Sequence, residues 1–269
     1  KSYRKSKKIR KTIKMIQLLD GKNYEHKELL SKMDDDSFYY GELNKLALSS
    51  SSLKLLLSSP KTYKHVTQYG NPETQPLRDG WLFHTAILEP HVFNAQIFVD
   101  VASKNTKAFK LAKEEHGRVF TMSEKNKAEK LADAFFRNEH ALRMITDCEF
   151  EVPAIGNVCG YPFRGKADVL GKDRIVDLKT TTDIKGFPYA AKKYGYDVQC
   201  YLYCSLFDVG YEQFKFLVMD KGSLDLGIWD CSEEFYLEGK RKVEKAVDIF
   251  ETFFVNGAAL DDYILTGTL

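Results

Sequence analysis

The sequence predicts an α/β fold, with a central mixed β-sheet flanked by helices and a helical part at the N-terminus. Three observations lead to this prediction. A charged β-hairpin spans residues 161–178, and the segments 213–219 and 226–231 read as further strands of the same sheet. A long helix with an apolar face is expected over residues 233–256. The chain has 269 residues, of which 43% are hydrophobic, so it can bury a substantial core.

The N-terminal end of the chain is basic. Residues 1–14 contain eight Lys or Arg and no acid, whereas the net charge of the whole chain is +2. Such an arm could bind phosphates through counterion release, or it could be a solubilising tail. We therefore treat residues 1–45 as a basic arm and extension without an assigned task, and residues 46–269 as one domain. The chain begins at Lys1 and not at Met, so it could be a fragment of a longer protein.

Two helices are expected before the sheet. The serines of residues 48–60 can cap a helix ahead of Leu53, and Pro60 ends it. The second helix covers residues 76–89, where apolar side chains recur at helical spacing around His84. A single histidine on an apolar helix can be a hydrogen-bonded core residue or a metal ligand.

Residues 104–145 predict two or three helices that are basic on one side. The lysines on that side are Lys104, Lys107, Lys110, Lys113, Lys125, Lys127 and Lys130. Such a surface is either a solvated face or one wall of a groove that contacts the phosphates of a duplex.

The hairpin carries charges where a buried strand would be apolar. Its strands, residues 161–170 and 175–178, are joined by a Gly-Lys-Asp turn. Because side chains alternate along a strand, Asp177 and Lys179 share one face, while Val176 and Leu178 point to the other. Three charged residues share a face of the first strand, namely Arg164, Lys166 and Asp168.

A short antiparallel connection can bring Asp168 opposite Asp177. Two adjacent carboxylates repel unless a proton or a divalent cation lies between them, and Mg²⁺ or Mn²⁺ suits such oxygen ligands. Lys179 can hold a water or stabilise charge that develops on a phosphate. The alternative is a solvated hairpin whose surface ion pairs contribute little.

Polar residues on either side of the hairpin are further candidates. Glu151 lies in an expected strand before it, and a helix with Asp197 as its N-cap follows it. Gln199 and Tyr203 are four residues apart, so they share a face of this helix and could simply brace the sheet.

The order of these motifs resembles the PD-(D/E)XK nuclease superfamily. The pattern is G-K-A-D, then I-V-D-L-K-T-T with Asp177 nine positions after Asp168, then Q-C-Y-L-Y. Within the superfamily, the chain is most similar to the branch with RecB-type nuclease domains and phage exonuclease VIII (RecE) type 5′–3′ DNA exonucleases. A Ser-x-Ser-x-Leu-Lys run that ends in Ser-Pro and the pattern G-x-x-x-H-x-x-x-L-E-P carry the same resemblance, which covers about residues 49–254.

The resemblance implies a role for each matching residue. The metal ligands of the superfamily are two acids, a histidine in this branch and a backbone carbonyl, which match Asp168, Asp177, His84 and Leu178. Lys179 is implied to assist the attacking water, Gln199 to orient the metal site or the scissile phosphate, and Tyr203 to contact DNA. Glu151 is a weaker candidate that could support the site and not bind metal.

The implied activity is that of a metal-dependent exonuclease with the restriction-endonuclease-like fold. Such an enzyme degrades linear double-stranded DNA from its ends, 5′ to 3′, and leaves a single strand for recombination. The implied cofactor is Mg²⁺, with Mn²⁺ possible, and the implied partners are further copies in a ring-like homo-oligomer and a single-strand annealing protein. A structure-specific or restriction-type endonuclease of the same fold and a non-catalytic DNA-binding relative are the alternatives.

Several other classes are disfavoured by what the sequence lacks. No apolar run approaches the roughly 18 residues of a membrane span, so we predict a cytoplasmic protein without a membrane partner. Five cysteines without a C-x-x-C pair favour reduced thiols over a disulfide framework, a zinc site or a clustered iron–sulfur ligand set. The absence of a G-x-x-x-x-G-K-[ST] loop argues against a nucleotide-driven motor.

Overall fold

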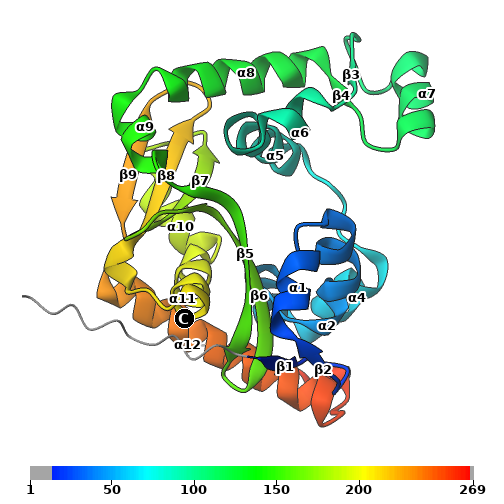
Figure 1. The fold of residues 1–269 in the computed structure, drawn as a ribbon. Helices are drawn as coiled ribbons and strands as arrows, with labels where there is room; N and C mark the ends of the chain where they lie inside the picture. The colour runs from blue at the N-terminus through cyan, green and yellow to red at the C-terminus, as the bar shows by residue number, and fades with distance from the viewer. Residues whose placement is uncertain (1–13, 267–269) are drawn as a thin grey trace, which may run out of the picture.

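A mixed sheet of five strands forms the centre of the computed structural model, which describes residues 14–266 (Figure 1). The strand order follows the chain: β5 (Glu149–Val158), β6 (Tyr161–Leu170), β7 (Ile175–Thr181), β8 (Phe214–Asp220) and β9 (Leu226–Asp230). β7 and β8 are parallel and every other neighbouring pair is antiparallel, which confirms the predicted mixed sheet. The basic residues 1–13 lie outside the described residues.

Helices cover both faces of the sheet, as predicted. α3 (Ser50–Ser58), α11 (Tyr196–Phe207) and α12 (Glu233–Phe250) pack on one face. α5 (Gln75–Leu88), α8 (Met122–Phe136) and α9 (Glu139–Ile145) pack on the other. Within β7 the alternation holds, because Ile175 is buried in the first core, whereas Val176 and Leu178 are buried in the second.

The N-terminal part wraps the outer side of β5 and β6 (Figure 1). Its elements are β1 (Met15–Gln17), β2 (Asn23–Glu25), α1 (His26–Lys32), a π-helical turn η1 (Phe38–Glu42), α2 (Leu43–Leu46) and α4 (Pro60–Tyr69). Apart from α4, these elements share a small core with Ile155 of β5, whereas Tyr63 of α4 packs in the larger core with α3, α11 and α12. The imidazole of His26 also contacts the carbonyl of Ile155 at 2.9 Å, so this part is bound directly to the sheet.

The remaining elements are short connections around the sheet. They are α6 (Pro90–Asn94), β3 (Phe98–Val99), α7 (Lys107–His116), β4 (Phe120–Thr121), α10 (Phe187–Lys193), η2 (Tyr211–Gln213), η3 (Glu251–Val255) and η4 (Leu260–Asp262). None of the helices between residues 14 and 266 has both the length and the apolar content needed to cross a bilayer.

Two local predictions need correction. Pro60 does more than end a helix, because it is also the first residue of α4, where its missing N–H is tolerated. Asp197 is not the N-cap of α11, since that position belongs to Gly195 with a positive φ of 64°. The Asp197 carboxylate instead contacts Lys242 of α12 and the amide of Val198.

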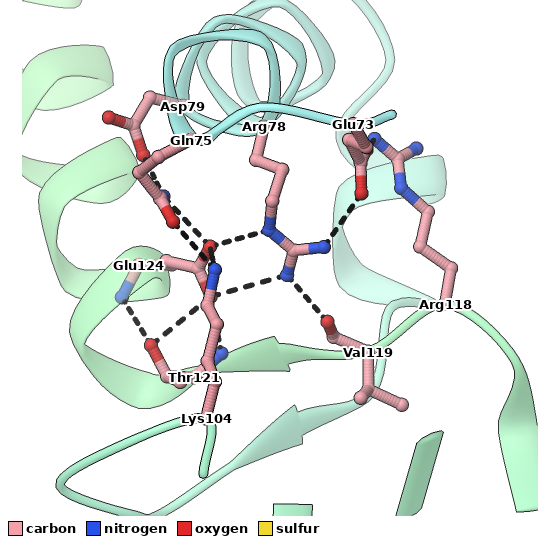
Figure 2. A network of polar contacts seen from close by, with 9 residues as sticks. All are labelled: Glu73, Gln75, Arg78, Asp79, Lys104, Arg118, Val119, Thr121 and Glu124. Atoms are coloured by element: carbon pink, nitrogen blue, oxygen red, sulfur yellow. Dashed lines mark hydrogen bonds and ion pairs between the residues drawn. The ribbon is translucent and has the colours of Figure 1, made fainter. Parts of the chain in front are cut away.

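A buried glutamate ties α5 to α8 (Figure 2). Glu124 is 5% exposed and forms a capping box with Thr121 at the start of α8. Its carboxylate also accepts hydrogen bonds from Arg78 of α5 at 2.8 Å and from Lys104 at 2.7 Å. Lys104 therefore belongs to this network and not to the predicted basic face. Lys107, another lysine of that predicted face, is exposed. The network holds the first turn of α5, the helix that carries His84.

Candidate active site

Two acids lie opposite each other on β5 and β6. Glu151 and Asp168 share one register position, because the pairs on either side of them are formed, namely Phe150 with Val169 and Val152 with Ala167. The pair between them is missing from the ladder, and Glu151 has a positive φ of 50°, an uncommon conformation for a residue with a side chain. The sheet is therefore locally distorted where these carboxylates meet.

The distortion continues between β6 and β7. Their ladder ends with Val169 opposite Val176, one step before Asp168 would meet Asp177. The side chain of Asp168 replaces the missing backbone partner, because its Oδ2 accepts a hydrogen bond from the amide of Leu178 at 2.7 Å. Glu151, Asp168 and Asp177 thus form a row of acids across three neighbouring strands.

His84 reaches this row from α5. Its Nε2 lies 2.7 Å from the carbonyl oxygen of Leu178, and only an N–H can donate to a carbonyl, so Nε2 carries a proton. Its Nδ1 faces the Oδ2 of Asp168 at 3.5 Å. In the neutral imidazole Nδ1 would be a lone pair facing a carboxylate, which is unfavourable unless a proton or a cation lies between them. The predicted meeting of His84, Asp168 and Leu178 is therefore present.

Asp177 is fully buried and faces the side of α11. Gln199 donates a hydrogen bond to its Oδ1, and the ammonium of Lys179 lies at ion-pair distance from its Oδ2. Among residues 14–266, that Oδ2 has no well-aligned hydrogen-bond donor. Burial, together with the nearby charge of Asp168, raises the pKa of Asp177 to about 6 despite the opposing effect of Lys179.

The charge state of Lys179 follows from the same acids. Burial alone would lower its pKa, but the charges of Asp177 and Asp168 outweigh burial, so the pKa of Lys179 is raised above its usual value. The ammonium lies 5.0 Å from the centroid of the Tyr196 ring. Lys179 is therefore suited to donate hydrogen bonds or to offset negative charge, and not to accept a proton.

Glu151 carries the largest electrostatic penalty of the row. Burial, followed by the charges of Asp168 and Glu89, raises its pKa to about 8, although Lys166 opposes this shift. A carboxyl with this environment holds a proton at neutral pH or requires a cation beside it. The sequence made Glu151 only a weaker candidate for the site. The one signal that could have identified it is its register opposite Asp168 on the neighbouring strand.

The side chains present suit a divalent cation. Among the described residues, His84, Glu151 and Asp168 each offer a ligand atom, and these atoms lie within 4.8 Å of one another. That spacing is about twice a metal–oxygen distance of roughly 2.0–2.6 Å, so one ion could contact all three. Asp177 lies outside this group, so its role as a ligand stays a prediction.

Gln199 and Tyr203 lie one turn apart on α11, but they contact different strands. Gln199 holds the carboxylate of Asp177, as a residue that orients the site would. Tyr203 is 8% exposed, and its hydroxyl donates a hydrogen bond of 2.9 Å to the carbonyl of Lys166. Tyr203 thus braces β6, and a direct contact with DNA stays a prediction of the resemblance.

Comparison with known families and structures agrees with the fold. Residues 49–253 match the family described as a PDDEXK-like domain of unknown function, DUF3799. No curated protein matches the sequence.

Among solved structures, a candidate exonuclease from Eubacterium rectale superposes with a TM-score of 0.63 at 16% identity, covering 87% of this chain and 95% of the other. At this identity the likeness concerns the fold alone. A phage-related exonuclease from Haemophilus somnus 129PT is also similar, at 17% identity over 79% of this chain and 97% of the other, but its TM-score of 0.35 is too low to support an argument.

Proposed function

Since the chain belongs to the PDDEXK-like domain family over residues 49–253, we propose that it is a metal-dependent DNA nuclease. The observation that carries the proposal is the row of acids closed by His84 on one side and Lys179 on the other. If the hairpin carried only solvated surface ion pairs, nothing would require three carboxylates to lie together on neighbouring strands. This arrangement favours the metal site over the solvated hairpin that the sequence left open.

The proposed chemistry is hydrolysis of a phosphodiester. The oxygen of a water forms a bond to phosphorus, the bond from phosphorus to one ester oxygen breaks, and that oxygen leaves with a proton. His84, Glu151 and Asp168 would hold the cation, with Asp177 and the Leu178 carbonyl as the further ligands that the resemblance implies. A bound cation would polarise the phosphate and lower the pKa of the attacking water.

The chain's own residues have separate tasks in this proposal. Lys179 remains protonated, so it donates to the attacking water or offsets charge on the phosphate in the transition state. Gln199 holds Asp177 in one orientation and keeps that carboxylate beside Lys179. Asp168 accepts a hydrogen bond from the Leu178 amide, and this bond holds the Asp168 carboxylate against β7.

The finer proposal is an exonuclease that degrades linear duplex DNA from its ends, 5′ to 3′. It rests on the resemblance to the RecE-type group. End-labelled linear duplex, with the label at either the 5′ or the 3′ end, should be digested with Mg²⁺ or Mn²⁺ and remain intact with a chelator. A covalently closed circular duplex is the control, because an end-dependent enzyme leaves it uncut. Cutting of the circle would favour the endonuclease, and no cutting of either substrate would refute the nuclease.

The same resemblance supports a ring-like homo-oligomer that encloses DNA and a single-strand annealing protein as partner, whereas a cytoplasmic location stays a prediction from the sequence. Enclosure would keep the enzyme on one strand through many cycles. Sedimentation at micromolar concentration should give a species several times heavier than the chain. A monomer at every concentration would contradict the ring.

A further inference from the structure

A second lysine lies beside Lys179. Lys54 of α3 places its ammonium 5.2 Å from the centroid of the Tyr196 ring, and Lys179 lies 5.0 Å from the same centroid. The two lysines are 125 positions apart in the sequence, and they meet at one aromatic ring.

The position of Lys54 is set by its surroundings. The amide of Leu48 donates a hydrogen bond to the carbonyl of Pro162 in β6 at 2.9 Å, and the carbonyl of Leu48 accepts one from the amide of Arg164 at 2.8 Å, so the start of α3 is fixed to the sheet. The stem of Lys54 runs along Gly195, where an added Cβ would lie 3.5 Å from its Cγ and Cε. The half-buried side chain is thereby aimed at the end of β7 that carries Lys179.

Among residues 14–266, Lys54 lacks a counter-ion of its own. The two acids whose charges act on it are Asp177 and Asp197, and both already contact another lysine. No carboxylate lies within ion-pair distance of the Lys54 ammonium in the part of the chain from residue 14 to residue 266. Burial and then the charge of Lys179 lower the pKa of Lys54 to about 8.

An ammonium without a counter-ion, next to the lysine of a proposed nuclease site, suits an anionic ligand. We propose that Lys54 binds a phosphate of the DNA strand that is being cut, next to the phosphate served by Lys179. The inference rests on the proposed function and names a further substrate contact of the same site. Lys54 would then contribute to binding, and Tyr196 would hold both ammonium groups toward the strand.

Three variants separate the charge of Lys54 from its packing. Lys54→Met keeps an unbranched stem beside Gly195 and removes the charge, whereas Lys54→Arg keeps the charge. Lys64→Met is the matched control, because Lys64 is an exposed lysine of α4 on the neighbouring helix. Far-UV circular dichroism and thermal melting establish that each variant is folded.

Binding is measured by fluorescence anisotropy on a labelled duplex with a single-stranded end, in chelator and across a series of NaCl concentrations. Lys54→Met should raise Kd about tenfold and lower the slope of log Kd against log salt by about one. Lys54→Arg should stay within about threefold of the parent protein, and Lys64→Met should match it. In the hydrolysis assay, Lys54→Met should raise KM more than it lowers kcat.

Equal Kd and salt slope for Lys54→Met and Lys64→Met would overturn the inference and leave Lys54 with a packing role. If the parent protein cuts DNA while these values are equal, only the inference fails. If the parent protein neither binds nor cuts DNA, the proposed function and the inference fail together.

Discussion

Two acidic residues, the buried Glu124 and the partly buried Glu151, have opposite environments. Glu124 is surrounded by donors and cations, and although burial alone would raise its pKa, the hydrogen bonds from Arg78 and Lys104 lower it strongly (Figure 2). Glu151 lies beside Asp168 and Glu89, and its pKa is raised to about 8. A compensated buried charge holds two helices together, whereas an uncompensated one requires a proton or a cation. The difference separates a structural cluster from a candidate catalytic one.

We call the residues around Glu124 the first cluster and the residues around Glu151, Asp168 and Asp177 the second cluster. The sharpest test of the contrast between them is a loss of activity when residues of the second cluster are replaced. Asp177→Ala, Asp168→Asn and Lys179→Ala should each lower DNA hydrolysis by about 10³-fold or more, because each removes a charge on which the proposed site depends. The assay is digestion of end-labelled linear duplex with Mg²⁺. Asp173→Asn in the exposed turn is the control and should keep the parent rate. Parent rates in Asp177→Ala or Lys179→Ala would remove the assignment.

Removing charge from the first cluster should affect stability instead. Glu124→Gln leaves Arg78 without its buried partner, so the free energy of unfolding should fall by about 2–4 kcal/mol. The melting temperature reports this change, and activity per folded molecule should stay within about twofold. The exposed pair of Lys32 and Glu28 serves as the control, since Glu28→Gln should cost less than about 0.5 kcal/mol. An unchanged melting temperature in Glu124→Gln would show that the network does not hold α5.

Removing the charge of Glu151 should change the free energy of unfolding in the opposite direction. Glu151→Gln relieves repulsion with Asp168, so without metal the variant should be more stable than the parent by about 1–3 kcal/mol. With saturating Mg²⁺ or Mn²⁺, the parent should gain about 2–3 kcal/mol and the variant much less. Thermal melting with and without metal measures both effects. An equal gain in both proteins would mean that Glu151 does not bind the metal.

The smallest expected effect is that the stability contributed by Glu124 depends on pH in the acid range. The pKa of Glu124 is lowered on folding, so its stabilisation is fully present above its unfolded value of 4.5 and is lost as pH falls below that value toward the folded pKa. The stability difference between the parent protein and Glu124→Gln should therefore shrink between pH 5 and pH 3. Melting curves at matched ionic strength measure it. A difference that grows in this range would reverse the sign and contradict the network.

Much of the fold was predictable because its signals are local. Alternation in residues 161–178 identified two strands of the sheet, and apolar spacing identified α5 and α12. The serine run before Leu53 produced the predicted capped helix, since a cap depends on neighbouring residues only. One failure was also local, because Gly195 takes a left-handed conformation and occupies the N-cap position that the sequence predicted for Asp197.

The sequence by itself determined which residue types stand at the candidate site, since the spacing of Asp168, Asp177 and Lys179 lies within one hairpin. It also determined that these residues lie on strands, because strand periodicity needs only a few neighbours. Only the tertiary structure decided that Glu151 joins Asp168 through the register of another strand, and that Lys54 meets Lys179 at the Tyr196 ring. Contacts between distant segments depend on how the whole sheet and its helices pack, and no local pattern encodes them.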